Sequence, residues 1–244
     1  MRKKIKGLLV ISLVVNVLFL LGGLYFVYKK GGINYLESKV VSAIYGQSEG
    51  YSAWYLDRVS TFKILPIKEN SIVLLGDSLT EGAEWGELLQ NPAVVNRGIL
   101  GDTTDLVLHR ISDITKTKPK KIFLMVGIND LLQGKNGDYV FNNYQQILDK
   151  VKMETPDTHI IIQSILPIDN TQLKNTFINT QDIMWLNDKL QSLCIGSKIE
   201  FVNLYSLYAS KDGKLGPMYT NKDGLHLNGD GYLLWGNAIK ALLA

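Results

Sequence analysis

Cysteine and histidine are scarce in this sequence. Cys194 is the only cysteine, and there are three histidines among 244 residues. A single cysteine cannot form an intrachain disulfide, and no Cys/His cluster has the spacing of zinc ligands. The Asp- and Gly-rich stretches also lack the twelve-residue pattern of a calcium loop. The sequence therefore predicts no metal site, and Cys194 is expected to be a small buried apolar residue.

Acidic residues are missing from the first thirty positions, which carry six basic side chains. The formal net charge of +3 is therefore a property of this end of the chain. The remaining residues carry 20 basic and 23 acidic side chains. A slightly acidic body offers no positive surface for a phosphate backbone, so nucleic-acid binding is not expected.

One long apolar run occupies residues 7–28, where Asn16 is the only strongly polar side chain. A helix of this length spans the ~30 Å hydrocarbon core of a bilayer. A cleaved signal peptide is the alternative, but its apolar region is usually about 7–15 residues and ends at a small-x-small site. Here the run ends in aromatic residues followed by Lys29 and Lys30. These features favour an uncleaved membrane anchor.

The basic residues around this run predict its orientation. Four of them and the free amino group precede the run, whereas only Lys29 and Lys30 follow it. Positive charges are retained on the cytoplasmic side of a membrane. We therefore expect a single-pass cell-membrane protein whose body, after residue 30, is extracytoplasmic.

The chain beyond the anchor divides into two parts. Residues 31–70 hold two helix-like stretches, 34–45 and 51–62, separated by a Gly-containing break. They are interpreted as a stalk and a lead-in helix, and the mixed apolar and charged spacing of the second indicates packing on the main domain. The predicted domains are an anchor at 1–30, the stalk and lead-in helices at 31–70, and one main domain at 71–244.

The main domain shows the alternation of an α/β fold. Apolar runs indicating strands lie at residues 71–76, 93–98, 121–127, 159–166 and 199–204. Helical patterns lie at residues 79–90, 104–114, 140–154, 177–193 and 230–243. Fully apolar strands alternating with helices predict a mainly parallel five-stranded sheet covered on both faces, in three α/β/α layers. Reacting groups in such folds gather where the strands end.

Polar residues follow three of the predicted strands. Ser78 stands where the first strand would turn into a helix, a position that exposes its hydroxyl beside a helix amino terminus. The backbone of Gly98 could approach a substrate oxygen closely, and Asn129 offers a neutral donor for a developing oxyanion. Each of these segments would also fit a turn or a helix N-cap. Taken alone, each could therefore have a purely structural role.

A histidine lies three residues after an aspartate near the carboxyl end, at Asp223 and His226. In such a turn the carboxylate can fix the imidazole tautomer and leave the other ring nitrogen to accept a serine proton. A surface turn rich in Asp-Gly and Asn-Gly is the alternative. His109 and His159 have no suitable partner nearby in the sequence and are assigned packing or surface roles.

Four segments occur in the order of the SGNH hydrolase blocks: Gly76-Asp77-Ser78-Leu79, Gly98, Gly127-Ile128-Asn129-Asp130 and Asp223-Gly224-Leu225-His226. The chain from about residue 71 onward thus resembles the GDSL/SGNH hydrolases, and residues 96–104 resemble their platelet-activating-factor acetylhydrolase-like branch. The resemblance implies a flavodoxin-like fold. It implies Ser78 as nucleophile, His226 as general base and acid, and Asp223 as its orienting partner. It further implies an oxyanion hole made by the N–H groups of Ser78 and Gly98 and the side chain of Asn129.

The expected function is therefore serine ester hydrolysis through an acyl-enzyme, without a metal or organic cofactor. An extracytoplasmic site favours short-chain, acetyl-type esters of a glycan or lipid as substrates. Two alternatives remain. An O-acyltransferase would use the same serine and pass the acyl group to a sugar or lipid hydroxyl, and a surface binding module would keep the fold without catalysis.

Overall fold

The computed structural model describes residues 2–29, 32, 51–173 and 177–244 and divides the chain into two compact units, Met1–Ala53 and Trp54–Ala244. The first unit contains helix α1 (Arg2–Lys29), whose side chains are described from Ser12 onward. The segment Ser12–Lys29 is long and apolar enough to cross a membrane, a property that a signal sequence near the amino terminus shares. The predicted helix at 34–45 and the break after it lie outside the described residues.

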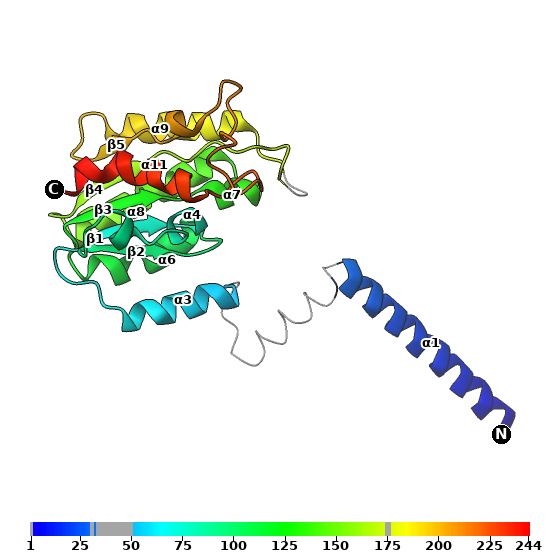
Figure 1. The fold of residues 1–244 in the computed structure, drawn as a ribbon. Helices are drawn as coiled ribbons and strands as arrows, with labels where there is room; N and C mark the ends of the chain where they lie inside the picture. Colours follow the sequence, from blue (N-terminus) through cyan, green and yellow to red (C-terminus); the bar gives the residue numbers. More distant parts are fainter. Residues whose placement is uncertain (1, 30–31, 33–50, 174–176) are drawn as a thin grey trace. The chain divides into compact units, whose positions relative to one another are not determined.

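A five-stranded parallel sheet forms the centre of the second unit (Figure 1). Its strands are β1 (Ile72–Gly76), β2 (Val94–Gly98), β3 (Lys121–Met125), β4 (His159–Gln163) and β5 (Glu200–Val202). Their order in the sheet is β2-β1-β3-β4-β5, and all four pairings are parallel. The predicted parallel sheet of five strands is thus confirmed. The chain leaves β1 toward one edge and returns at β3 toward the other, so the strand order reverses between β1 and β3, where ligands bind in open α/β sheets.

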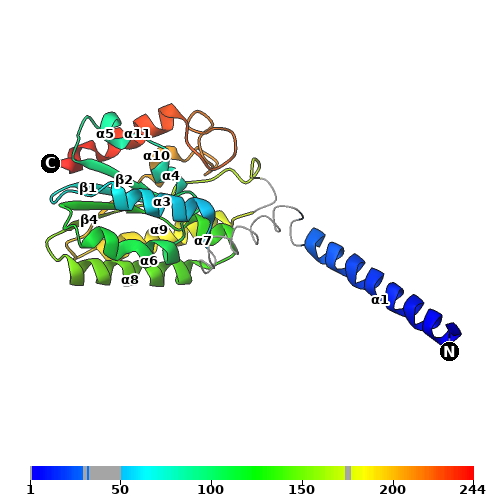
Figure 2. The ribbon, with the colours of Figure 1, turned by 90° about the horizontal axis from the view of Figure 1, so that it is seen from below.

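Helices cover both faces of the sheet, as Figure 2 shows. One face carries α6 (Thr104–Thr115), α8 (Gly137–Glu154) and α9 (Thr180–Cys194), and the other carries α4 (Ser78–Glu81), α5 (Trp85–Leu88), α10 (Tyr205–Tyr208) and α11 (Gly229–Ile239). Alternate residues of β1 enter the two separate hydrophobic cores: Val73 and Leu75 join one, Ile72 and Leu74 the other. The unbroken apolar character of β1 follows from this two-sided burial.

Several helices differ from their predicted bounds. The pattern at 79–90 forms two single-turn helices, α4 and α5, because the chain leaves the helical path at Gly82. The pattern at 230–243 ends as α11 followed by a 3₁₀ turn at Lys240–Leu243. Two short helices, α7 (Ile128–Leu132) and α10, were not predicted, since four or five residues are too few to show a helical period.

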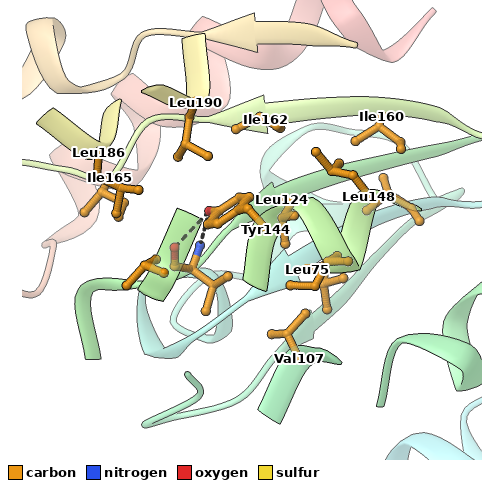
Figure 3. Close-up of a cluster of buried hydrophobic side chains, with 14 of the residues drawn as sticks. Leu75, Val107, Leu124, Tyr144, Leu148, Ile160, Ile162, Ile165, Leu186 and Leu190 are labelled. Carbon is orange, nitrogen blue, oxygen red and sulfur yellow. Dashed lines mark hydrogen bonds between the residues drawn. The ribbon is translucent and has the colours of Figure 1, made fainter. Parts of the chain in front are cut away.

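The core holds the end of β3 in place through Tyr144 (Figure 3). This α8 residue is fully buried between Leu124, Ile162 and their neighbours. Its hydroxyl donates to the carbonyl of Val126 at 2.8 Å and accepts from the Val126 N–H at 3.1 Å. Both backbone polar groups of Val126 therefore have hydrogen-bond partners inside an apolar core. These bonds hold in place the start of the segment that leads to Asn129.

The lead-in helix α3 (Ala53–Ile64) packs on the sheet domain. Tyr55 of α3 is buried, and its hydroxyl donates to the carbonyl of Leu106 in α6 at 3.5 Å. The Arg97 guanidinium lies 4.6 Å from the centre of the Phe62 ring and also donates to the carbonyl of Leu65. These contacts join α3 to β2 and α6, so the compact unit begins at Trp54, whereas the predicted domain boundary lies at residue 71.

Candidate active site

A serine, a histidine and an aspartate lie within hydrogen-bond distance of one another. The Oγ of Ser78 is 3.0 Å from Nε2 of His226, and Nδ1 of the same ring is 2.7 Å from Oδ2 of Asp223. With Nδ1–H donating to the carboxylate, Nε2 is the nitrogen that accepts from the serine hydroxyl. The structure thus brings together three residues that the sequence separates by as many as 148 positions.

The backbone around Ser78 explains its position. Asp77 has extended backbone angles and caps α4, since its Oδ1 accepts from the N–H of Leu79 at 3.0 Å. The turn from β1 into α4 passes so close to β3 that a Cβ on Gly76 would lie 2.2 Å from the carbonyl oxygen of Met125. Only glycine fits there. Strand, glycine and cap together put Ser78 at the first residue of a helix, at the end of β1.

The turn that carries His226 is closed by Asp223. Oδ1 of this residue accepts from the N–H groups of Leu225 at 2.9 Å and His226 at 2.8 Å, while Oδ2 meets the ring. Gly224 has φ +83°, and a Cβ there would lie 2.4 Å from the carbonyl oxygen of Asp169. One carboxylate therefore both shapes the turn and orients the imidazole.

Partial burial acts to raise the pKa of Asp223. The N–H groups of His226 and Leu225, together with the His226 ring, outweigh that effect, and the pKa of Asp223 lies below its usual value. This carboxylate is consequently ionised at neutral pH. It can stabilise a positive charge that forms on the ring of His226.

Asn129 lies in α7, which follows β3. Its Nδ2 donates to the carbonyl of Asp102 at 2.8 Å, so one of its two amide hydrogens is engaged, and the other has no partner among the residues that the structure describes. Asp130 beside it is buried and accepts from the N–H of Thr104 at 2.9 Å and from its hydroxyl at 2.6 Å. These bonds join α7 to the start of α6.

The N–H of Gly98, expected to be an oxyanion donor, has an acceptor within the protein. Its N–H already donates to Oδ1 of Asn96 at 2.8 Å. A Cβ on Gly98 would lie 2.3 Å from the backbone nitrogen of Glu81, so the glycine permits the close approach of β2 to α4. The sequence predicted the Gly98 N–H to be an oxyanion donor, whereas in this structure that N–H is engaged by Asn96.

Asn96 is a residue that the sequence did not single out. Its Nδ2 donates to the carbonyls of Thr80, Glu81 and Ala83 at 2.9, 3.1 and 3.0 Å. The same side chain thus provides hydrogen-bond partners both for the carbonyls at the end of α4 and for the N–H of Gly98. No local sequence pattern reveals the three bonds to these carbonyls, because they lie 13 to 16 positions away, whereas the bond to Gly98 spans two positions.

Gly101 was also missed as a candidate. It lies in the exposed turn after β2 with φ +79°, and within the described part of the chain its N–H has no hydrogen-bond partner. Its neighbour Leu100 lines the same cleft as Ser78. A glycine that directly precedes a helix-capping segment was the available signal, since such turns require a positive φ.

The paired side chains open onto a cleft of about 310 Å³. It is lined by Trp54, Ser78, Glu81, Gly82, Leu100, Asn221, His226, Leu227 and Tyr232. Elements from both ends of the second unit therefore contribute to it, from α3 to α11.

The remaining candidates lie elsewhere. His159 faces Glu200, with Nε2 and Oε1 3.1 Å apart, and Nδ1 of His109 lies 3.5 Å from the hydroxyl of Tyr55. Cys194 is buried, as predicted, and burial raises the pKa of its thiol to about 11. Among the residues that the structure describes, no group of three or more His, Cys, Asp or Glu side chains is arranged to hold a metal ion.

The profile of the GDSL-like Lipase/Acylhydrolase family matches residues 74–234. The chain belongs to this family. Human platelet-activating factor acetylhydrolase IB subunit alpha2 is 27% identical over 175 residues, which are 68% of this chain and 72% of that protein. N-acylneuraminate cytidylyltransferases of Streptococcus agalactiae are 27% identical over 164 residues, 65% of this chain. The match spans only 35% of the length of these cytidylyltransferases.

Solved structures give the same assignment. A GDSL-like lipase from Bacteroides thetaiotaomicron is 26% identical and superposes with a TM-score of 0.67, covering 78% of this chain and 96% of its own. A Streptococcus pneumoniae protein named after platelet activating factor is 28% identical with a TM-score of 0.69, covering 78% and 91%. The predicted resemblance to GDSL hydrolases is confirmed, and the chain is an esterase-type hydrolase of this family.

Proposed function

We propose that this GDSL hydrolase cleaves short-chain, acetyl-type esters of an extracytoplasmic glycan or lipid with Ser78 as nucleophile, His226 as general base and acid, and Asp223 as orienting carboxylate. The observation that carries the proposal is the continuous hydrogen-bonded series from Ser78 Oγ through the His226 ring to Asp223, with distances of 3.0 and 2.7 Å. A nucleophile, a base and an orienting group in this order are what acyl transfer by serine requires.

The reaction proceeds in two steps. His226 Nε2 takes the proton of Ser78 Oγ as that oxygen attacks the ester carbonyl carbon. The imidazolium then gives the proton to the departing alkoxide, which leaves as an alcohol, and the acyl group remains on Ser78. In the second step His226 takes a proton from water, the hydroxide attacks the acyl-enzyme, and the carboxylic acid leaves as Ser78 recovers its proton.

The oxyanion formed in each step needs donors that are in place beforehand. The backbone N–H of Ser78 and the unengaged amide hydrogen of Asn129 are proposed as two of them. Gly101 replaces Gly98 as the proposed third donor, because the N–H of Gly98 is engaged by Asn96 whereas that of Gly101 has no partner in the described part of the chain.

The names of the relatives support the substrate class. One group is named as a platelet-activating factor acetylhydrolase, and the other as an N-acylneuraminate cytidylyltransferase, of which the match spans only 35%. The acetylhydrolase name supports an acetyl ester as the substrate. An extracytoplasmic location is proposed from the apolar α1 and the excess of basic residues before its apolar run.

A fluorophosphonate probe and an ester panel test the proposal on the full-length protein in detergent. The probe should label the wild type and not Ser78→Ala, and Ser78→Ala should lose at least about 10³-fold in kcat/KM on the best acetyl ester. Cys194→Ala is a matched control that should retain both labelling and turnover. Labelling of Ser78→Ala at the wild-type level would exclude Ser78 as the nucleophile.

A further inference from the structure

The cleft beside Ser78 has an apolar wall that comes partly from outside the family-matched region. Trp54 belongs to α3, twenty positions before residue 74, where the match begins. It lines the cleft together with Leu100 from the turn after β2. Trp54 is 48% exposed and Leu100 51% exposed, so both present apolar surface that a bound molecule could cover.

Glu81 holds Trp54 against the catalytic helix. The indole Nε1 of Trp54 donates to Oε2 of Glu81 at 3.3 Å, and Nε of Arg58 lies 2.9 Å from Oε1 of the same carboxylate. Trp54 and Arg58 are one helical turn apart on α3, so both reach the same acceptor. Glu81 itself belongs to α4, three residues after Ser78.

The same carboxylate also holds the other half of the wall. Oε2 of Glu81 accepts from the backbone N–H of Leu100. One side chain on the helix of Ser78 thus fixes both Trp54 and the Leu100 turn. The wall is consequently set at a defined place relative to Ser78, as a substrate-contacting surface needs to be.

We propose, building on the serine esterase function above, that Trp54 and Leu100 bind an apolar portion of the ester, and that Trp54 is a specificity-determining residue. The favoured substrates are esters with an apolar chain or ring next to the scissile bond. Covering roughly 50–60 Å² of apolar surface corresponds to about a tenfold gain in affinity. Helix α3 is then part of the substrate site and not only a connection to the anchor.

Two ester series measured on the full-length protein in detergent test this. One keeps the acetyl group and enlarges the alcohol from methanol to butanol and benzyl alcohol, and the other keeps methanol and enlarges the acyl group from acetyl to butyryl and octanoyl. Trp54→Ala should raise the KM of the large members of one series about tenfold relative to methyl acetate. The series that responds identifies which side of the ester the wall receives.

Two further variants sharpen the result. Trp54→Phe keeps an aromatic ring and should recover most of the preference for large esters over methyl acetate. Such a recovery would show that the effect of Trp54→Ala comes from the lost ring and not from misfolding. Met153→Ala removes a large exposed apolar side chain on α8, outside the residues that line the cleft, and should leave the KM ratios at wild-type values. If Trp54→Ala does not fold, Leu100→Ala carries the same expectation.

The outcomes separate this inference from the function on which it rests. A wild type that hydrolyses esters and is labelled at Ser78, with KM ratios unchanged in Trp54→Ala, would overturn the inference and leave the esterase proposal intact. An equal rise in KM for every ester, methyl acetate included, would also overturn it. A wild type with neither labelling nor ester hydrolysis would overturn both.

Discussion

Asp77 shows how a single buried side chain links the stability of the site to pH. It is 1% exposed and caps the helix that begins with Ser78. Burial raises its pKa from 3.8 to about 7, against the opposing effect of the Leu79 N–H, with the nearby Asp102 and Asp130 adding to the rise. Between about pH 4 and 7 the folded protein therefore holds a proton that the unfolded chain has released.

The sign of the resulting pH dependence follows from this difference. Because the folded state binds the extra proton, raising the pH from about 4 to 7 lowers the free energy of unfolding, by at most about 4 kcal/mol from this group. Asp77→Asn cannot ionise and can still accept from the Leu79 N–H. Its free energy of unfolding should therefore rise relative to the wild type as the pH increases through that window.

Urea unfolding at several pH values between 4 and 7.5 measures this difference. Asp157→Asn makes the same substitution at an exposed aspartate and serves as the control. Parallel curves for Asp77→Asn and the wild type would mean that Asp77 is already ionised in the folded protein at pH 4.

At the level of single residues, the sequence was informative where a residue with a reactive or hydrogen-bonding side chain stands next to the end of a predicted strand or the start of a predicted helix. Ser78, Asn129 and His226 are polar residues that follow strands or precede the last helix, and the family order of their segments joins them. The engagement of the Gly98 N–H was missed, although the Asn96 side chain that accepts from it lies only two positions earlier, as in an Asx-turn. The close approach of Gly98 to Glu81 could not be predicted, because the two residues lie far apart in the sequence. A backbone donor is available only when no other acceptor reaches it, and that depends on the three-dimensional arrangement.

At the level of elements, the contact of β2 with α4 can be tested through Gly98. An added Cβ would lie 2.3 Å from the backbone nitrogen of Glu81 and 2.7 Å from the carbonyl carbon of Thr80. Backbone atoms cannot move aside as a flexible side chain can, so Gly98→Ala should cost about 1–3 kcal/mol or more. For a domain of this size, a loss of about 1–3 kcal/mol should lower the melting temperature by about 2–12 °C.

Gly229→Ala is the matched control for this substitution. Its added Cβ meets nothing within 4 Å, and alanine suits a helical position better than glycine, so the melting temperature should stay the same or rise slightly. A Gly98→Ala protein with a wild-type melting temperature but no esterase activity would argue against the packing role. That result would instead support the backbone N–H of Gly98 as an oxyanion donor.

Element prediction worked best where burial imposes a pattern on many residues. The central strands β1, β3 and β4 were predicted because they are buried on both faces and therefore read as largely apolar runs. The edge strands β2 and β5 are only partly buried. The break between α4 and α5 was missed, since residues 79–90 keep a helical apolar spacing across it. There, tertiary contacts from Asn96 to the carbonyls of Thr80, Glu81 and Ala83 replace the helical bonds.

At the scale of the whole molecule, α3 lies before the family-matched residues in the sequence but belongs to the same compact unit from Trp54 onward. The sequence predicted that this helix packs on the main domain, and Tyr55 and Phe62 make the contacts that fix it. It could not predict that Trp54 reaches the cleft, because the acceptor of its indole N–H lies 27 positions further on. The compact unit, with Trp54 in the cleft that Ser78 also lines, thus begins before residue 74, where the family match starts.

The apolar α1 leads to a prediction about the complete chain in cells. If α1 is an uncleaved anchor, the protein should sediment with membranes, resist extraction at pH 11, and keep an amino-terminal tag. Leu18→Arg places a charge near the middle of the apolar run at a cost of about 2.5–3.5 kcal/mol for insertion, so it should weaken membrane retention. Lys30→Gln, at the end of the run, is the control and should remain bound.

The same experiment distinguishes the two interpretations of this segment and tests its orientation. A cleaved signal peptide would separate the amino-terminal tag from the body and leave the body unattached, whereas an anchor keeps them in one membrane-bound chain. Protease added outside intact cells should digest the body and spare the tag, because the basic residues at 2–6 favour a cytoplasmic amino terminus. A protected body with an exposed tag would reverse the orientation, and an extracytoplasmic substrate could then no longer reach Ser78.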